Sequence, residues 1–252
     1  MGALHAGHLS LVTLAQTRVD VVIVSIFVNP TQFGPNEDFD NYPRSFEQDI
    51  SLLEAEAVDM VYIPAIQEIY PNGQEVDVKA DELLARLHEG EHRAGHFDGV
   101  ATVVVRLLEQ SGADKAVFGQ KDYQQLQIIR QMVRDHKLPV EIIGAPIARE
   151  GDGLAMSSRN RYLSDRERKI APQLSFILGQ TAKMIKAGDA KAPEKAKQVL
   201  LEAGFDTIDY VVLVDAITLQ PITVLNQEAR LLAAATLGKT RLIDNIAVEP
   251  TS

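Results

Sequence analysis

The sequence has no cysteine, no long apolar run and fewer basic than acidic residues, and each of these absences excludes a class of protein. Without cysteine, the chain cannot form disulfides, zinc–thiolate sites, iron–sulfur clusters or thiolate nucleophiles. No apolar run reaches the roughly 18 residues of a membrane span. The first residues lack the basic and apolar pattern of a secretion signal, so we expect a cytoplasmic location and no membrane partner.

The charge balance argues against nucleic acid as a partner. The chain has 25 Lys and Arg against 35 Asp and Glu, which gives a formal net charge of −10. Such a chain is repelled by a phosphate backbone unless it carries a strong local basic patch. Its 252 residues, 46% of them hydrophobic, suffice for one large folded domain or two smaller ones. We therefore expect small-molecule chemistry.

Short β-branched runs alternate with helical patterns in the first part of the chain. The nearly continuous apolar run 20–28 predicts a strand buried on both faces. A capping box of Ser45 and Gln48 predicts the start of a helix. Further strand-like runs cover 58–64, 114–119 and 140–148, and helical periodicity covers 99–110 and 122–136. This alternation predicts an α/β domain at 1–154, with a parallel sheet covered by helices on both faces.

In the second part, helical patterns come first and strands follow. Ser164 and Glu167 form a capping box that predicts a long helix to about Lys186. Pro193 opens another helix, which stops before Gly204. The strand-like runs are 208–215, 229–237 and 242–249, with a tight turn at 238–240. We expect a small α+β domain with an antiparallel sheet at 155–252.

Two histidines, His5 and His8, stand at the expected start of the first helix. They share one face of that helix, and Gly7 between them lets a ligand approach the backbone. A helix N-terminus favours an anion, and two imidazole donors suit the charge that develops on an attacked phosphate. The alternatives are a pair of surface histidines and a zinc site, which no third ligand or HExxH pattern supports.

Polar segments also follow two expected strands, at the edge where open α/β sheets bind ligands. Asn29 and Pro30 turn the chain after the first strand, and Gln32 can bind hydroxyls and a carboxylate there or be merely solvated. After the run 114–119, Lys121 can meet a phosphate. Asp122 can cap the next helix or accept a ribose hydroxyl.

Helical periodicity separates two glutamines in the pattern 122–136. Gln125 aligns with the apolar Ile128, whereas Gln127 aligns with the charged Arg130. An amide on a buried face needs hydrogen-bond partners, which a polar substrate can supply. Gln125 is therefore a candidate substrate ligand.

A fourth polar segment, Met156-Ser157-Ser158-Arg159, combines two hydroxyls, consecutive backbone amides and a guanidinium. These groups can hold a polyphosphate, although the segment alone is also typical of a polar loop. This segment comes after the strand-like run 140–148, so three of the four polar segments follow strands, which favours a common site.

Taken together, the motifs resemble the pantothenate synthetase (pantoate–β-alanine ligase) family of the HxGH nucleotidyltransferase superfamily. The resemblance covers essentially the whole chain, with Ala94 where the family has proline. It implies a Rossmann-like first domain and a C-terminal domain that closes as a lid over a water-labile intermediate. The matching motifs are MGALHAGH (1–8), SIFVNPTQF (25–33), YPRSFEQD (42–49), EIYPNG (68–73), HRAGHFDGVATVV (92–104), FGQKDYQQL (118–126), DGLAMSSRNRYL (152–163) and RLIDN (241–245).

The resemblance implies a ligase that joins (R)-pantoate to β-alanine at the expense of ATP. A pantoyl adenylate would form first, and the products would be pantothenate, AMP and pyrophosphate. The resemblance also implies Mg²⁺ on the ATP phosphates, with no protein ligand that we can name, and a homodimer.

The same resemblance assigns residues to roles. His8, His5 and Lys121 are the expected catalytic residues, with His8 as proton donor. Gln32 and Gln125 are expected to bind pantoate, and Gln32 also lies near β-alanine. The residues expected to bind ATP are Met1, Gly2, His5, Gly7, His8, Gly119, Gln120, Lys121, Asp122, Ala148, Met156, Ser157, Ser158 and Arg159.

Family members carry a further helix and a strand ending in Pro-Thr before the Met-Gly, and we expect that first strand to be missing from the sequence. Two other functions stay open. One is a different HxGH adenylyl- or nucleotidyltransferase, including one acting on tRNA, which the acidic charge disfavours. The other is a non-catalytic ATP-binding protein.

Overall fold

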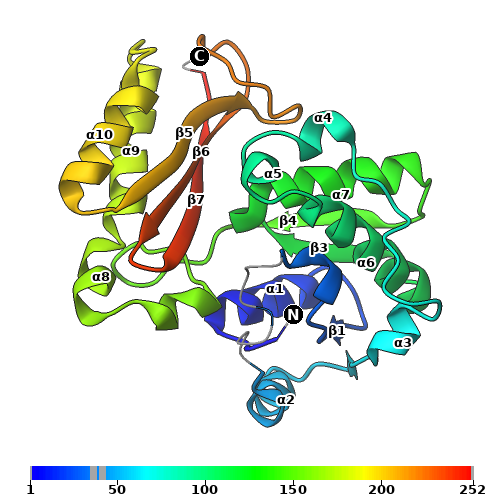
Figure 1. Ribbon diagram of the computed structural model, residues 1–252. Coiled ribbons are helices and arrows are strands. Elements are labelled where there is room, and N and C mark those ends of the chain that lie inside the picture. Colours follow the sequence, from blue (N-terminus) through cyan, green and yellow to red (C-terminus); the bar gives the residue numbers. More distant parts are fainter. Residues whose placement is uncertain (1, 35–38, 40–43, 251–252) are drawn as a thin grey trace. The chain divides into compact units, whose positions relative to one another are not determined.

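The computed structural model describes residues 2–34, 39 and 44–250, coloured along the chain in Figure 1. The chain divides into two compact units, Met1–Pro146 and Ile147–Ser252. Among the described residues, no helix has both the length and the apolar character needed to cross a membrane.

The first unit alternates short strands with helices, as expected. Its strands form two parallel pairs, β1 with β2 and β3 with β4. Helices α1 and α7 both pack against the pair β3–β4. In chain order the elements are α1 Ala6–Gln16, β1 Ile23–Ser25, η1 Pro30–Gln32, α2 Phe46–Ala55, β2 Met60–Tyr62, α3 Ile66–Ile69, α4 Glu82–Ala85, α5 Glu89–His92, α6 His96–Ser111, β3 Lys115–Gly119, η2 Gln120–Asp122, α7 Tyr123–Asp135 and β4 Glu141–Ala145.

Strand β1 is shorter and less buried than its apolar run predicts. Val21 and Ile23 are 60% and 38% exposed, so the prediction of burial on both faces is wrong. The alternate side chains point into the core, because a strand turns successive residues to opposite faces. The buried cluster on that face is Leu4, Val12, Val22, Val24, Ile26 and Leu53.

The second unit consists of helices followed by a three-stranded antiparallel sheet in the order β5-β6-β7. Helices α9 and α10 pack against this sheet (Figure 1). The predicted tight turn is confirmed, since Leu237 pairs with Thr240 and Gly238 adopts a φ of +57°. The elements are η3 Ser158–Tyr162, α8 Asp165–Ile170, α9 Gln173–Lys186, α10 Ala192–Ala203, β5 Thr207–Asp215, β6 Ala229–Leu237 and β7 Thr240–Val248.

Two of the helix predictions need correction. The capping box of Ser164 and Glu167 forms, but the predicted helix to Lys186 is two helices, because Pro172 lacks an N–H and ends the first of them. The box of Ser45 and Gln48 does not form. Ser45 is the N-cap residue of α2, and its hydroxyl donates to the carboxylate of Asp49 at 3.0 Å.

The segment 147–154, which the sequence analysis placed in the first domain, packs with the second unit. Arg149 pairs with Ala155 in an antiparallel bridge. The Arg149 side chain also forms an ion pair of 2.7 Å with Asp244 on β7. These contacts account for the division of the chain at Pro146.

Candidate active site

The first turn of α1 is built by its two histidines. His5 is the N-cap residue, and its Nδ1 accepts a hydrogen bond from the backbone N–H of Gly7 at 3.1 Å. Nδ1 of His8 accepts from the backbone N–H of His5 at 3.3 Å, and the two ring centroids lie 4.0 Å apart. Because a backbone N–H can only donate, both Nδ1 atoms are unprotonated and each neutral ring carries its proton on Nε2. Two neighbouring Nε2–H donors result.

The environment of His8 keeps its ring neutral. Burial, followed by the nearby His5 and the positive charge of Lys121, lowers the pKa of His8 from 6.5 to about 3. At neutral pH, His8 therefore donates a hydrogen bond without adding a charge. Lys121 supplies the positive charge near this pair, so an anion would meet one full charge and two neutral donors.

The turn that leads into α1 is anchored by a buried carboxylate that the sequence analysis missed. Asp49 on α2, 1% exposed, accepts from the backbone N–H groups of Ala3 at 2.9 Å and Leu4 at 2.8 Å. Ala3 has a φ of +49°, a left-handed conformation that costs a non-glycine residue energy. Asp49 holds this strained turn in place and so fixes where α1 begins.

The segment after β3 places a lysine and an aspartate at the start of α7. Lys121 lies in the 3₁₀ turn η2, and its Nζ is 3.9 Å from a carboxylate oxygen of Asp122. Asp122 occupies the N-cap position of α7, yet its side chain makes no capping bond, which overturns the capping interpretation. Gln120 donates from Nε2 to the carbonyl of Gly144 at 3.2 Å and thereby ties η2 to β4.

Gln32 is held by the buried amide of Asn29, the N-cap residue of η1. Asn29, 3% exposed, donates from Nδ2 to Oε1 of Gln32 at 3.3 Å and to the carbonyl of Gly99 at 3.1 Å. Its Oδ1 accepts from the hydroxyls of Thr31 at 3.1 Å and Tyr70 at 2.6 Å. Since Asn29 uses Oε1 of Gln32 as its acceptor, the NH₂ group of Gln32 is the end that can bind a carboxylate or hydroxyl oxygen.

Backbone packing fixes the turn η1, which contains Gln32, against α6. A Cβ added to Gly99 would lie 2.4 Å from the carbonyl oxygen of Thr31, so only glycine permits this approach. His96 lies within hydrogen-bonding distance of the carbonyl of Gln32 through Nδ1, at 2.8 Å, and of Arg93 through Nε2, at 2.9 Å. Because arginine can only donate, Nε2 is the acceptor and Nδ1–H donates to the carbonyl.

The burial of the glutamines in α7 differs from what helical periodicity predicts for the segment 122–136. Gln125 is partly buried, but Gln127, expected on the polar face, is only 5% exposed, so that expectation is wrong. Gln124 is 4% exposed, and its amide bonds the backbone of Leu84 and Glu89. Helix α7 packs on β3 and β4 and also on α4 and α6, which leaves it a wider buried face than a single sheet would give.

In the second unit, the segment Met156–Arg159 follows a hairpin of residues 149–155, whose ends are joined by the bridge between Arg149 and Ala155. The N–H of Met156 donates to the carbonyl of Ala148 at 2.9 Å, which occupies one acceptor position of that carbonyl. Ser157 is the N-cap of η3, and its hydroxyl accepts from the N–H of Arg159 at 3.3 Å. Ser158 is 8% exposed.

Within the first unit, the structure brings His5, Gly7, His8 and Lys121 together, and it sets Gln32 beside Asn29. Gly2 is buried next to the turn that Asp49 holds. Gly119 ends β3, and a Cβ added to it would lie 4.0 Å from the side chain of Leu11 on α1. Met1 lies outside the described residues. Among the described residues, no group of three or more histidine or acidic side chains is placed to hold a metal ion.

Comparison with known proteins gives one consistent result. The family model for pantoate-beta-alanine ligase matches residues 1–247. A pantothenate synthetase from Sphingopyxis alaskensis is 52% identical over 98% of this chain and 89% of its own length.

Solved structures agree with this match. The structure of pantothenate synthetase from Thermus thermophilus has a TM-score of 0.95 at 44% identity and covers 99% of this chain and 91% of its own. A pantoate-beta-alanine ligase from Francisella tularensis, complexed with beta-gamma ATP and beta-alanine, has a TM-score of 0.82 at 38% identity, over 98% of this chain and 86% of its own. The chain therefore belongs to the pantoate-beta-alanine ligase family, whose members are ligases that form a C–N bond.

Proposed function

We propose that this chain activates pantoate with ATP and transfers the pantoyl group to β-alanine, using the residues described above. In the first step a carboxylate oxygen of pantoate attacks the α-phosphorus of ATP, and the bond to pyrophosphate breaks. In the second step the amine of β-alanine attacks the acyl carbon of the adenylate, AMP leaves, and the amine loses a proton.

The observation that carries this proposal is the neutral histidine pair beside Lys121. Negative charge accumulates on the phosphate oxygens as the carboxylate attacks, and preorganised donors lower the energy of that state. The Nε2–H groups of His5 and His8 supply two such donors, and the ammonium group of Lys121 offsets the charge. Neither step needs a protein nucleophile, so positioning and charge stabilisation are sufficient.

The remaining residues are assigned to substrate binding. The NH₂ group of Gln32, oriented by Asn29, would bind the carboxylate or hydroxyl oxygens of pantoate, and Gln125 would bind the same substrate from α7. Asp122 would accept a ribose hydroxyl, because its carboxylate is 51% exposed and does not cap α7. In the second unit, Ser157, Ser158 and Arg159 would hold the phosphates, and the backbone near Ala148 would meet the adenine.

Mg²⁺ enters the proposal as part of the MgATP substrate. Protein sites for this ion commonly combine one or two carboxylates with substrate phosphates, so a three-carboxylate cluster is not required. A homodimer, a cytoplasmic location and a C-terminal unit that closes as a lid complete the proposal and rest on the family resemblance.

The test of the proposed function is substrate-dependent AMP release. The purified chain with MgATP is expected to release AMP in a one-to-one ratio with pantothenate only when both pantoate and β-alanine are present. AMP release that requires an amino acid and tRNA would contradict the proposal, and so would ATP binding without turnover in the folded protein.

A further inference from the structure

We propose that Arg149 is a positioning residue for ATP, because its ion pair with Asp244 fixes the hairpin from which Met156–Arg159 extends. This inference rests on the proposed function, which assigns that segment to the nucleotide. Arg149 itself need not touch the substrate.

The ion pair between Arg149 and Asp244 has two-point geometry. Nη1 of Arg149 donates to Oδ2 of Asp244 at 2.7 Å, and Nη2 donates to Oδ1 at 2.8 Å. The Asp244 side chain is only 2% exposed, and the residue lies on β7 opposite Ala233 of β6. A paired fork of this kind fixes the orientation as well as the distance of the two groups.

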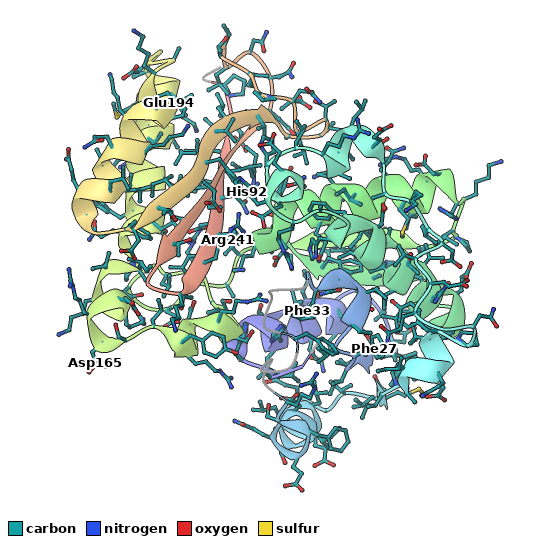
Figure 2. All side chains as sticks on the ribbon, in the orientation of Figure 1. Phe27, Phe33, His92, Asp165, Glu194 and Arg241 are labelled. Carbon is teal, nitrogen blue, oxygen red and sulfur yellow. The ribbon has the colours of Figure 1, made fainter. Side chains whose placement is uncertain are left out.

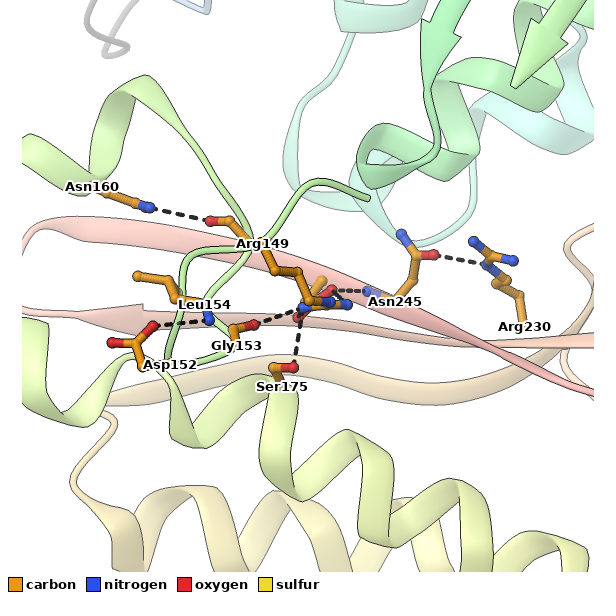
Figure 3. A network of polar contacts seen from close by, with 10 residues as sticks. Arg149, Asp152, Gly153, Leu154, Asn160, Ser175, Arg230 and Asn245 are labelled. Atoms are coloured by element: carbon orange, nitrogen blue, oxygen red, sulfur yellow. Dashed lines mark hydrogen bonds and ion pairs between the residues drawn. The ribbon is translucent and has the colours of Figure 1, made fainter. Parts of the chain in front are cut away.

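The guanidinium of Arg149 also binds the turn of its own hairpin and helix α9. Nη1 of Arg149 also donates to the carbonyl of Gly153 and to Oγ of Ser175, both at 3.0 Å (Figure 3). Gly153 lies in the turn of the hairpin, while Ser175 belongs to α9. One side chain therefore joins the turn, a helix and a strand, three elements distant in sequence.

Hydrogen bonds connect the hairpin to the candidate phosphate-binding segment Met156–Arg159. Its two arms are joined by the Arg149–Ala155 bridge and by the bond from the N–H of Met156 to the carbonyl of Ala148. Asn160 in η3 donates from Nδ2 to the carbonyl of Ala155 at 3.1 Å and to Glu150 at 3.0 Å. The residues from Met156 to Arg159 lie between these two attachments, so a shift of the hairpin would displace them.

The surface provides a second, weaker support for the hairpin. Arg168 of α8 pairs with Glu150 and Asp152, both at 2.6 Å, with side chains that are a third or more exposed. Exposed pairs contribute little to rigidity, because water competes for both partners. The carboxylate of Asp244, by contrast, is 2% exposed, so its pair with Arg149 is the support on which the position of the segment depends.

The test replaces Arg149 with lysine, which keeps the charge opposite Asp244 but cannot form the two-point fork. We expect Arg149→Lys to raise the KM for MgATP about tenfold and to leave the KM for β-alanine within about twofold of its original value. Asp244→Asn serves as a second variant, since it keeps the shape of the side chain and should shift the same constant in the same direction. Thermal melting and circular dichroism confirm that each variant is folded.

Arg241→Lys is the matched control. Arg241, labelled in Figure 2, lies on β7 and pairs with Asp209 at 2.7 Å; its side chain is 27% exposed, as is that of Arg149. Its Nε donates to Oδ2 of Asp209 on β5, so we expect Arg241→Lys to leave the KM for MgATP unchanged.

An unchanged KM for MgATP in folded Arg149→Lys and Asp244→Asn would contradict the positioning role. An equal rise in all three substrate constants would contradict it too, because general loosening of the fold predicts that result. Calorimetric titration of each variant with MgATP alone separates this inference from the proposed function. Failure of the unaltered chain to make pantothenate contradicts the function, whereas equal MgATP affinity in the unaltered chain and its variants contradicts the role of Arg149.

Discussion

Replacing His8 with alanine is expected to slow formation of the pantoyl adenylate by about 10²–10³-fold, the usual loss when one donor to a transition-state oxyanion is removed. The ring of His8 provides an Nε2–H donor next to that of His5, and water cannot reproduce its fixed orientation. Pyrophosphate release with MgATP and pantoate, in the absence of β-alanine, isolates this step.

The control for this variant is His136→Ala. His136 is the exposed C-cap residue of α7 in the same unit, so its removal should leave the rate unchanged. A folded His8→Ala protein that forms the adenylate at the original rate would show that the role assigned to His8 is wrong.

Replacing Asp49 with asparagine is expected to lower both stability and activity. The asparagine side chain offers one acceptor oxygen, so one of the buried N–H groups of Ala3 and Leu4 would face an NH₂ group. A buried donor left without a partner costs about 1–3 kcal/mol in the free energy of unfolding. Release of the strained Ala3 turn would also displace α1, and a shift of this kind can reduce the rate by up to about 10²-fold. Denaturant unfolding and the pyrophosphate assay measure the two effects.

Asp98→Asn is the corresponding control. Asp98 also accepts a backbone N–H from a distant loop, that of Ala80 at 3.0 Å. Asp98 lies in the first turn of α6, so this bond fixes the loop to α6 and not to the start of α1. We expect this variant to lose stability without a matching loss of adenylate formation. Equal loss of rate in both variants would mean that Asp49 has no special relation to the histidines.

The motifs that carry chemistry could be located from the sequence because they rest on local rules. His5 and His8 are three residues apart, and a helix start explains both their proximity and their role as caps. The hairpin at Gly238 and the cap at Ser164 are local in the same sense, and both are confirmed. Local rules do not extend to which turns are held by distant side chains.

The supports of the site could not be predicted for that reason. Asp49 acts on Ala3 and Leu4 across 46 and 45 positions, and Arg149 acts on Asp244 across 95. Nothing in the pattern of polar residues distinguishes these carboxylates from solvated ones. The burial of Gln127 also depends on several elements around α7 rather than on its own periodicity.

The low pKa of His8 also has a consequence for stability. Between pH 6.5 and about 3, the unfolded chain binds a proton at His8 and the native protein does not. The contribution of His8 to stability is therefore complete above pH 6.5 and is lost as the pH falls toward 3.

The most direct test of the central claim is an NMR titration of the imidazole ¹⁵N signals of His8 in the folded protein. The neutral donor pair predicts a ring protonated only at Nε2 that does not titrate between pH 8 and about 4, in line with a pKa of about 3. A titration near pH 6.5, or a ring protonated at Nδ1, would contradict it.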